Sequence, residues 1–188
     1  MDALMAAIVA AALGQLGDKT AWLVAILADR YRAPGRVIAA AAVALLAASG
    51  IAAAGGAFIA PRITPEAKQL FLGMALVLQG GGAFFPVKMP GRLAGWRLGA
   101  VLTTLAGLFI LAFGDGVQFT VVTLAARTPF PVLAAIGATT GSLAVVVPAA
   151  ILGEAAWARV PWRWVRVGAG ALFLLAGAAI GLTAVGLL

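Results

Sequence analysis

Residues 4–28 read LMAAIVAAALGQLGDKTAWLVAILA, and this stretch decides the fold class. A helix needs about 20 mostly apolar residues to cross a bilayer, and here the only charges, Asp18 and Lys19, lie deep inside the run. The whole chain of 188 residues is 64% hydrophobic and 10% charged, whereas soluble domains have about 45–50% apolar and about 25% charged residues. The sequence therefore predicts an integral membrane protein that is surrounded by the lipid bilayer.

Six apolar blocks follow one another along the chain, separated by short stretches that contain proline, glycine and charged residues. None of the blocks shows the period-two alternation of a membrane β-strand. We therefore expect an all-α polytopic membrane protein with six transmembrane helices, at 4–28, 37–60, 69–85, 97–126, 132–152 and 165–187.

The residue types also exclude several classes of site. The chain contains no histidine and no cysteine, so zinc fingers, histidine-ligated haem, Ser-His-Asp triads, thiol nucleophiles and disulfides are ruled out. Six spans joined by short loops leave no room for an appended soluble catalytic domain. We expect a protein that is not an enzyme and has no resident cofactor.

Lysine and arginine are distributed unequally between the two sides of the expected bundle. Three of them, Arg62, Lys68 and Arg127, lie on the side that holds both termini. The other side holds nine, namely Arg30, Arg32, Arg36, Lys88, Arg92, Arg97, Arg159, Arg163 and Arg166. Because basic loops stay in the cytoplasm, we expect a protein of the inner (plasma) membrane with both termini on the non-cytoplasmic side. The net charge of +7 is then a matter of topology, and no nucleic-acid partner is expected.

The second half of the chain repeats the first at a constant offset of 97 residues. Gly17-Asp18 matches Gly114-Asp115, and Pro34 matches Pro131. Three further glycines, Gly56, Gly73 and Gly80, match Gly153, Gly170 and Gly177. Each half has three spans, an odd number, so the halves must enter the membrane in opposite directions. We therefore expect two inverted three-helix repeats, 1–94 and 95–188, as in many secondary transporters.

Asp18 and Asp115 are the residues most expected to carry function. Ionisable groups inside membrane spans are costly and usually functional, and these two occupy matched positions in the first and fourth spans. Gly17 and Gly114 precede them and allow local unwinding of the helix. A buried carboxylate without a partner either takes up a proton or binds a cation. We predict that the two carboxylates approach each other near the midplane and bind a cation between them.

Two carboxamides are expected to complete this site. Residues three apart share one face of a helix, which places Gln15 beside Asp18 and Gln118 beside Asp115. Both glutamines are expected on the outer side of the aspartates. Oxygen ligands of this kind suit a hard cation. The hydroxyls of Thr20, Thr120 and Ser142 are weaker candidates.

The stretch Gln15–Thr20 resembles the signature E-x-G-D-[KR]-[TS] of the Gdt-type manganese/calcium exporters, a family within the lysine-exporter superfamily. Its second copy is 112–118, and the resemblance extends over essentially the whole chain. It implies six helices in inverted repeats and exchange of Mn²⁺ or Ca²⁺ for protons. It also implies that Asp18 and Asp115 are metal ligands, with Gly17, Lys19, Thr20 and Gly114 in supporting positions.

The motifs of this chain depart from that signature. Gln15 and Ala112 stand where each motif has its glutamate, and Gly116 and Val117 replace the basic and hydroxyl residues of the second copy. The main hypothesis is a secondary cation transporter. The alternative is a transport-impaired paralogue with a regulatory or partner-subunit role, so a homo- or hetero-oligomer stays open. An intramembrane aspartyl protease is disfavoured, because the glycines at Gly14 and Gly17 have the wrong spacing for its G-x-G-D signature.

Overall fold

The computed structural model describes residues 2–187, and every regular element within them is a helix. The long helices are α3 (Pro34–Ile59), α4 (Pro65–Gly82), α7 (Pro131–Trp157) and α8 (Trp162–Ala184). The shorter ones are α1 (Asp2–Gln15), α2 (Lys19–Tyr31), η1 (Ala60–Arg62), α5 (Gly99–Ala112) and α6 (Gly116–Ala125). The all-α prediction is confirmed.

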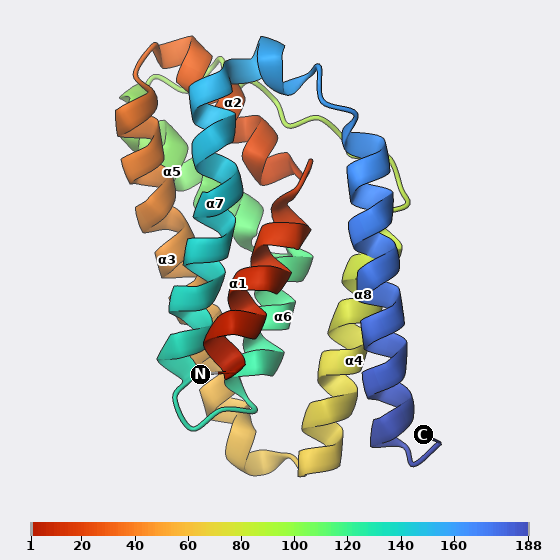
Figure 1. Cartoon of the computed structure of the whole chain (residues 1–188). Coiled ribbons are helices and arrows are strands. Elements are labelled where there is room, and N and C mark those ends of the chain that lie inside the picture. The colour runs from red at the N-terminus through yellow and green to blue at the C-terminus, as the bar shows by residue number, and fades with distance from the viewer. Residues whose placement is uncertain (1, 188) are drawn as a thin grey trace.

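The helices form an elongated bundle in which the chain runs repeatedly from one end to the other (Figure 1). Both termini lie toward the lower end in this view, where the connections 60–64 and 126–130 are also found. The connections 32–33, 83–98 and 158–161 lie at the upper end. This upper end carries the loops that are rich in arginine.

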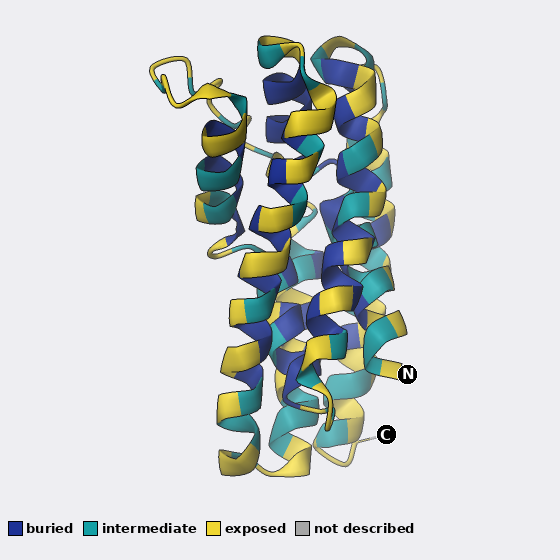
Figure 2. Ribbon diagram, turned by 90° about the vertical axis from the view of Figure 1, so that its left-hand side faces the viewer, coloured by how far each residue is buried: buried dark blue, intermediate teal, exposed yellow. Residues whose placement is uncertain are grey.

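Three helical segments are long and apolar enough to cross a membrane by themselves, namely Pro34–Arg62, Pro131–Trp157 and Trp162–Ala184. The pair α5 and α6 counts as a fourth if it crosses as one bent span. Exposed residues lie along the outer faces of the bundle (Figure 2). Many of them are large and apolar, among them Leu46 and Phe58 of α3. Lipid solvates such apolar side chains favourably, so the chain is a multi-pass membrane protein.

Two of the expected spans, 4–28 and 97–126, are not continuous helices. The first is broken between α1 and α2, and the second between α5 and α6, where the axis bends by 69°. Gly17 and Gly114 stand at the breaks with φ of +67° and +89°. This left-handed conformation is open to glycine and costly for other residues. The local unwinding that the two glycines allow is thus present at both matched positions.

Glycines also bring α4 and α8 into close contact. A Cβ placed on Gly73 would lie 2.9 Å from the carbonyl oxygen of Gly177, and one on Gly80 would lie 2.7 Å from that of Gly170. Small residues let two helix backbones approach in this way. The repeat offset pairs Gly73 with Gly170 and Gly80 with Gly177. Each α4 glycine contacts the α8 glycine that is paired with the other one. The contact is therefore unchanged when the two halves of the chain are exchanged.

Polar contacts at the upper end hold the loop 83–98 in place. The Arg30 guanidinium donates hydrogen bonds to the carbonyls of Leu93 at 2.6 Å and Trp96 at 3.0 Å. Arg92 forms an ion pair with Glu154 at 2.7 Å. The Glu154 backbone N–H donates in turn to Asp29 at 2.7 Å. Part of the positive charge at this end therefore stabilises the loop structure.

Candidate functional site

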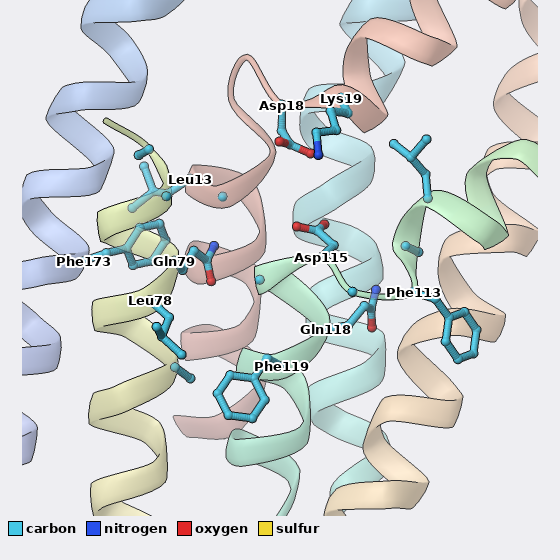
Figure 3. Close-up of a pocket in the computed structure, with 18 of the residues that line it drawn as sticks. Leu13, Asp18, Lys19, Leu78, Gln79, Phe113, Asp115, Gln118, Phe119 and Phe173 are labelled. Carbon is cyan, nitrogen blue, oxygen red and sulfur yellow. The ribbon is translucent and has the colours of Figure 1, made fainter. Parts of the chain in front are cut away.

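A cavity of about 1130 Å³ lies where the two helix breaks face α4 and α8. It is partly open, and most of its wall is apolar. Its polar and charged lining residues are Asp18, Lys19, Gln79, Asp115, Gln118 and Arg166. The labelled ones in Figure 3 come from three places: Asp18 and Lys19 from the start of α2, Asp115 and Gln118 from the start of α6, and Gln79 from α4.

The two aspartates occupy equivalent places in this cavity. Asp18 is the N-cap residue of α2, and Asp115 is the N-cap residue of α6. One Asp115 carboxylate oxygen accepts a hydrogen bond from the Val117 N–H at 3.4 Å, whereas the Asp18 side chain makes no such cap. Both side chains are half-buried and line the same space. The two carboxylates that the sequence singled out thus share one cavity (Figure 3).

Lys19 lies beside Asp18 at the start of α2 and also lines the cavity. Its side chain is exposed. Neighbouring residues on a helix point in different directions. Within residues 2–187 no ion pair joins Lys19 to Asp18. Asp18 therefore keeps its oxygens available to a ligand, with a positive charge close by.

The two carboxamides have different surroundings. Gln118 lines the cavity, and its Nε2 donates to the Ser49 hydroxyl at 3.5 Å, while its buried Oε1 has no partner among the described residues. Gln15 is 1% exposed, lies outside the cavity lining, and neither of its side-chain polar atoms has a partner in the described chain. The expected shared helix face with Asp18 does not form, because α1 ends at Gln15 before the break.

The residues expected in supporting positions, Gly17, Thr20 and Gly114, also differ in where they lie relative to the cavity. Gly114 lines the cavity, and a Cβ added there would meet nothing within 4 Å. Gly17 is buried, and a Cβ there would lie 2.9 Å from Trp162 Cβ and 3.0 Å from Arg166 Cδ. Thr20 is buried away from the cavity. The two breaks therefore share a left-handed backbone conformation. Side chains of α8 pack over Gly17, whereas no side chain packs over the open face of Gly114 in the described chain.

Of the other two hydroxyl candidates, Ser142 is buried outside the cavity lining. Thr120 is also buried, and its hydroxyl lies within hydrogen-bond distance of the Gly116 carbonyl oxygen at 3.1 Å and of Gln79 Oε1 at 2.7 Å.

Gln79 and Arg166 are cavity residues that the sequence reasoning missed. Gln79 is an isolated amide in the apolar helix α4, and the repeat offset pairs it with Ala176, so a search for matched positions passes over it. Its isolation within an apolar run was the available signal. Arg166 was counted as a loop charge, but its guanidinium donates to the carbonyls of Phe85 at 3.0 Å and Gly82 at 3.3 Å.

Comparison with known proteins identifies the family. The model of the divalent cation/proton antiporter GDT1 matches this chain twice, over residues 3–89 and over residues 100–186. The chain belongs to the GDT1 family. A curated relative from Vibrio cholerae serotype O1, named "Putative manganese exporter", is 30% identical over 176 residues, which cover 93% of this chain and 88% of that protein. No solved structure matches the chain significantly.

The acidic residues that line this cavity are Asp18 and Asp115. Across residues 2–187, no group of three or more His, Cys, Asp or Glu side chains is placed to hold a metal ion. The oxygen ligands that line the cavity include two carboxylates, Asp18 and Asp115, and the carboxamide of Gln118. Such a set offers hard oxygen ligands with few negative charges.

Proposed function

We propose that this protein is a secondary transporter that exchanges an inorganic divalent cation, Mn²⁺ or Ca²⁺, for protons through the cavity between the two helix breaks. One observation carries the proposal: in a chain of the GDT1 family, Asp18 and Asp115 are the N-cap residues of matched half-helices and line one cavity. The cation binds between these carboxylates and is released to the opposite side of the inner membrane.

The helix breaks suit a cation site. The carbonyl ends of α1 and α5 stop at the breaks, and helix C-termini carry partial negative charge that favours cations. They add to the oxygens of Asp18, Asp115 and Gln118. Lys19 and Arg166 also line the cavity and offset the negative charge of the two aspartates. This favours moderate affinity, as a carrier that must release its ion requires.

Exchange for protons follows from the partly apolar surroundings of the carboxylates. An ionised carboxylate without a counter-ion is costly in an apolar environment. When the cation leaves, protons therefore take its place on Asp18 and Asp115. The carboxylates of Asp18 and Asp115 then bind either protons or the metal ion. Transport of the metal ion is therefore coupled to transport of protons.

The proposed architecture is six spans in two inverted repeats, with α1–α2 and α5–α6 each counted as one broken span. Support comes from the family match, whose two copies begin at residues 3 and 100. The α4–α8 glycine contacts, which map onto each other at the repeat offset, also support it. With the arginine-rich end in the cytoplasm, both termini lie on the outer side.

The alternative function is a transport-impaired paralogue with a regulatory or partner-subunit role. It is favoured by one observation, the replacement of both motif glutamates by Gln15 and Ala112. In that case the protein would complete or regulate a second subunit that carries intact motifs.

Proteoliposomes of the purified full chain separate the two functions. We expect uptake of Mn²⁺ or Ca²⁺ driven by a proton gradient, with protons moving in the opposite direction, measured by ion- and pH-sensitive dyes. Folded protein that moves neither ion under any gradient would overturn the transporter proposal in favour of the paralogue.

A further inference from the structure

We propose that Gln79 supplies a carboxamide oxygen to the transported cation, as a ligand from α4 that lies outside both sequence motifs. This inference rests on the proposed transport function and concerns the same cavity. It names a residue that has no counterpart in the second half of the chain, where the offset leads to Ala176.

Gln79 lies between the two motif segments. A Cβ placed on Gly116 would be 3.3 Å from both Cβ and Cγ of Gln79, and a Cβ on Gly14 would overlap its Nε2. Gly116 directly follows Asp115, and Gly14 precedes the break that contains Asp18. Both glycines leave room for this side chain, which extends from α4 into the cavity wall (Figure 3). Gln79 thus packs beside both motif segments.

The Thr120 hydroxyl is the hydrogen-bonding neighbour of the Gln79 carboxamide. The Thr120 hydroxyl is within hydrogen-bond distance of two acceptors, Gln79 Oε1 at 2.7 Å and the Gly116 carbonyl oxygen at 3.1 Å. A hydroxyl has one proton and can donate to only one of them. In this orientation Gln79 Nε2 is buried without a partner among the described residues.

Rotating the carboxamide by half a turn leaves the Thr120 hydroxyl with a single acceptor, the Gly116 carbonyl oxygen. Amide oxygen and nitrogen positions are assigned from their hydrogen bonds. After the rotation, Gln79 Nε2 donates to the Thr120 hydroxyl, and that hydroxyl donates to the Gly116 carbonyl. The oxygen Oε1 then replaces the unpartnered nitrogen against Gly14. This acceptor lies in the wall of the cavity that holds the two aspartates and has no partner among the described residues, so it is suited to a cation.

The chemistry of the site calls for such an oxygen. Ca²⁺ takes about six to eight oxygen ligands, and both motif glutamates are replaced in this chain. Gln79 adds a neutral oxygen, so it raises the number of ligands without raising the charge. The cation is then held from α4 as well as from the two broken helices, which makes the site asymmetric between the repeats.

A purely structural role for Gln79, linking α4 to α6 through Thr120, makes different predictions. If Gln79 only supports this link, Gln79→Met breaks the bond to Thr120 and lowers the thermal stability of the protein, while the protein that stays folded keeps its cation affinity. If Gln79 is a cation ligand, Gln79→Met lowers the cation affinity itself, because Met offers no oxygen that a hard cation prefers, whereas Gln79→Glu keeps an oxygen at the same position.

The test measures Mn²⁺ and Ca²⁺ affinity and flux for these two variants in the full chain in proteoliposomes. We expect Gln79→Met to weaken the apparent affinity about tenfold, equivalent to about 1.4 kcal/mol. We expect Gln79→Glu to keep or tighten binding, with a steeper dependence on pH because a proton competes for the new carboxylate. The matched control is Gln69→Met, on the same helix but outside the cavity lining.

The outcomes distinguish this inference from the proposed function. If wild-type protein transports the cation and Gln79→Met matches the Gln69→Met control in affinity, the inference is overturned and the transport function stands. If Gln79→Met keeps affinity while Gln79→Glu loses it, the residue is structural, and the inference is again overturned. If folded wild-type protein neither binds nor moves the ions, both proposals fall together.

Discussion

Gly80 of α4 lies directly against the backbone of Gly170 in α8, so that a Cβ on Gly80 would be 2.7 Å from the Gly170 carbonyl oxygen. The contact joins α4 and α8, which hold matched positions at the repeat offset of 97. It is a close backbone approach that only glycine permits. Together with the Gly73–Gly177 contact, it makes α4 and α8 a closely packed pair beside the cavity.

The first prediction concerns this contact. Gly80→Ala forces a Cβ into backbone atoms that cannot move independently, and we expect it to lower the stability by about 1–3 kcal/mol, as overpacking does. Gly81→Ala is the matched control, because a Cβ at Gly81 meets nothing within 4 Å. There the better helix propensity of alanine should leave stability unchanged or higher. Thermal unfolding in detergent measures both, and equal melting temperatures would show that α4 and α8 are not in close contact.

The second prediction concerns the two aspartates. Asp18→Asn and Asp115→Asn keep the shape of the side chain and lose the charge that holds a cation, so each should abolish cation flux in a folded protein. Glu66→Gln is the control, since Glu66 is exposed in the first turn of α4 and lies outside the cavity lining. Flux is measured in proteoliposomes and folding by size-exclusion profile. Wild-type flux in either asparagine variant would remove that residue from the mechanism.

The third prediction separates the two glutamines. Gln118 lines the cavity and has a free Oε1, whereas Gln15 is buried elsewhere. We expect Gln118→Ala to weaken the apparent cation affinity several-fold, because a ligand oxygen is lost. Gln15→Ala should alter stability and leave affinity close to that of wild type. Side-specific affinity in oriented vesicles checks both, and an equal loss of affinity in the two variants would restore Gln15 to the site.

The fourth prediction concerns topology. The arginine-rich end of the bundle is opposite the end that holds both termini (Figure 1). We therefore expect a reporter fused after the last residue to be active only on the non-cytoplasmic side. A cytoplasmic reporter signal would reverse the proposed orientation and with it the outer position of Gln118.

Particular residues show how far the sequence alone reaches. The apolar blocks predict the all-helical membrane class, because the length and composition of a span follow from the thickness of the bilayer. The positions of Asp18 and Asp115 could be matched because their repeat carries glycine and aspartate together, which chance in an alanine-rich chain rarely produces. The motif residues 15–20 also led to the family that the comparison identifies.

Other features could not be obtained in this way. The sequence reasoning extrapolated one straight helix through 4–28 and therefore placed Gln15 on the face of Asp18, whereas the left-handed backbone at Gly17 changes the direction of the chain after α1. Gln79 was overlooked because its place beside Gly14 and Gly116 depends on how α4 crosses the broken helices.

The sequence by itself determined that this chain is a helical membrane protein of two related halves with a carboxylate in each, because these properties depend on local composition and on spacing along the chain. The tertiary structure decided which side chains share the cavity. That depends on the direction the backbone takes at each glycine and on how closely α4 and α8 approach each other. These are steric properties of residues far apart in the chain, and no local pattern encodes them.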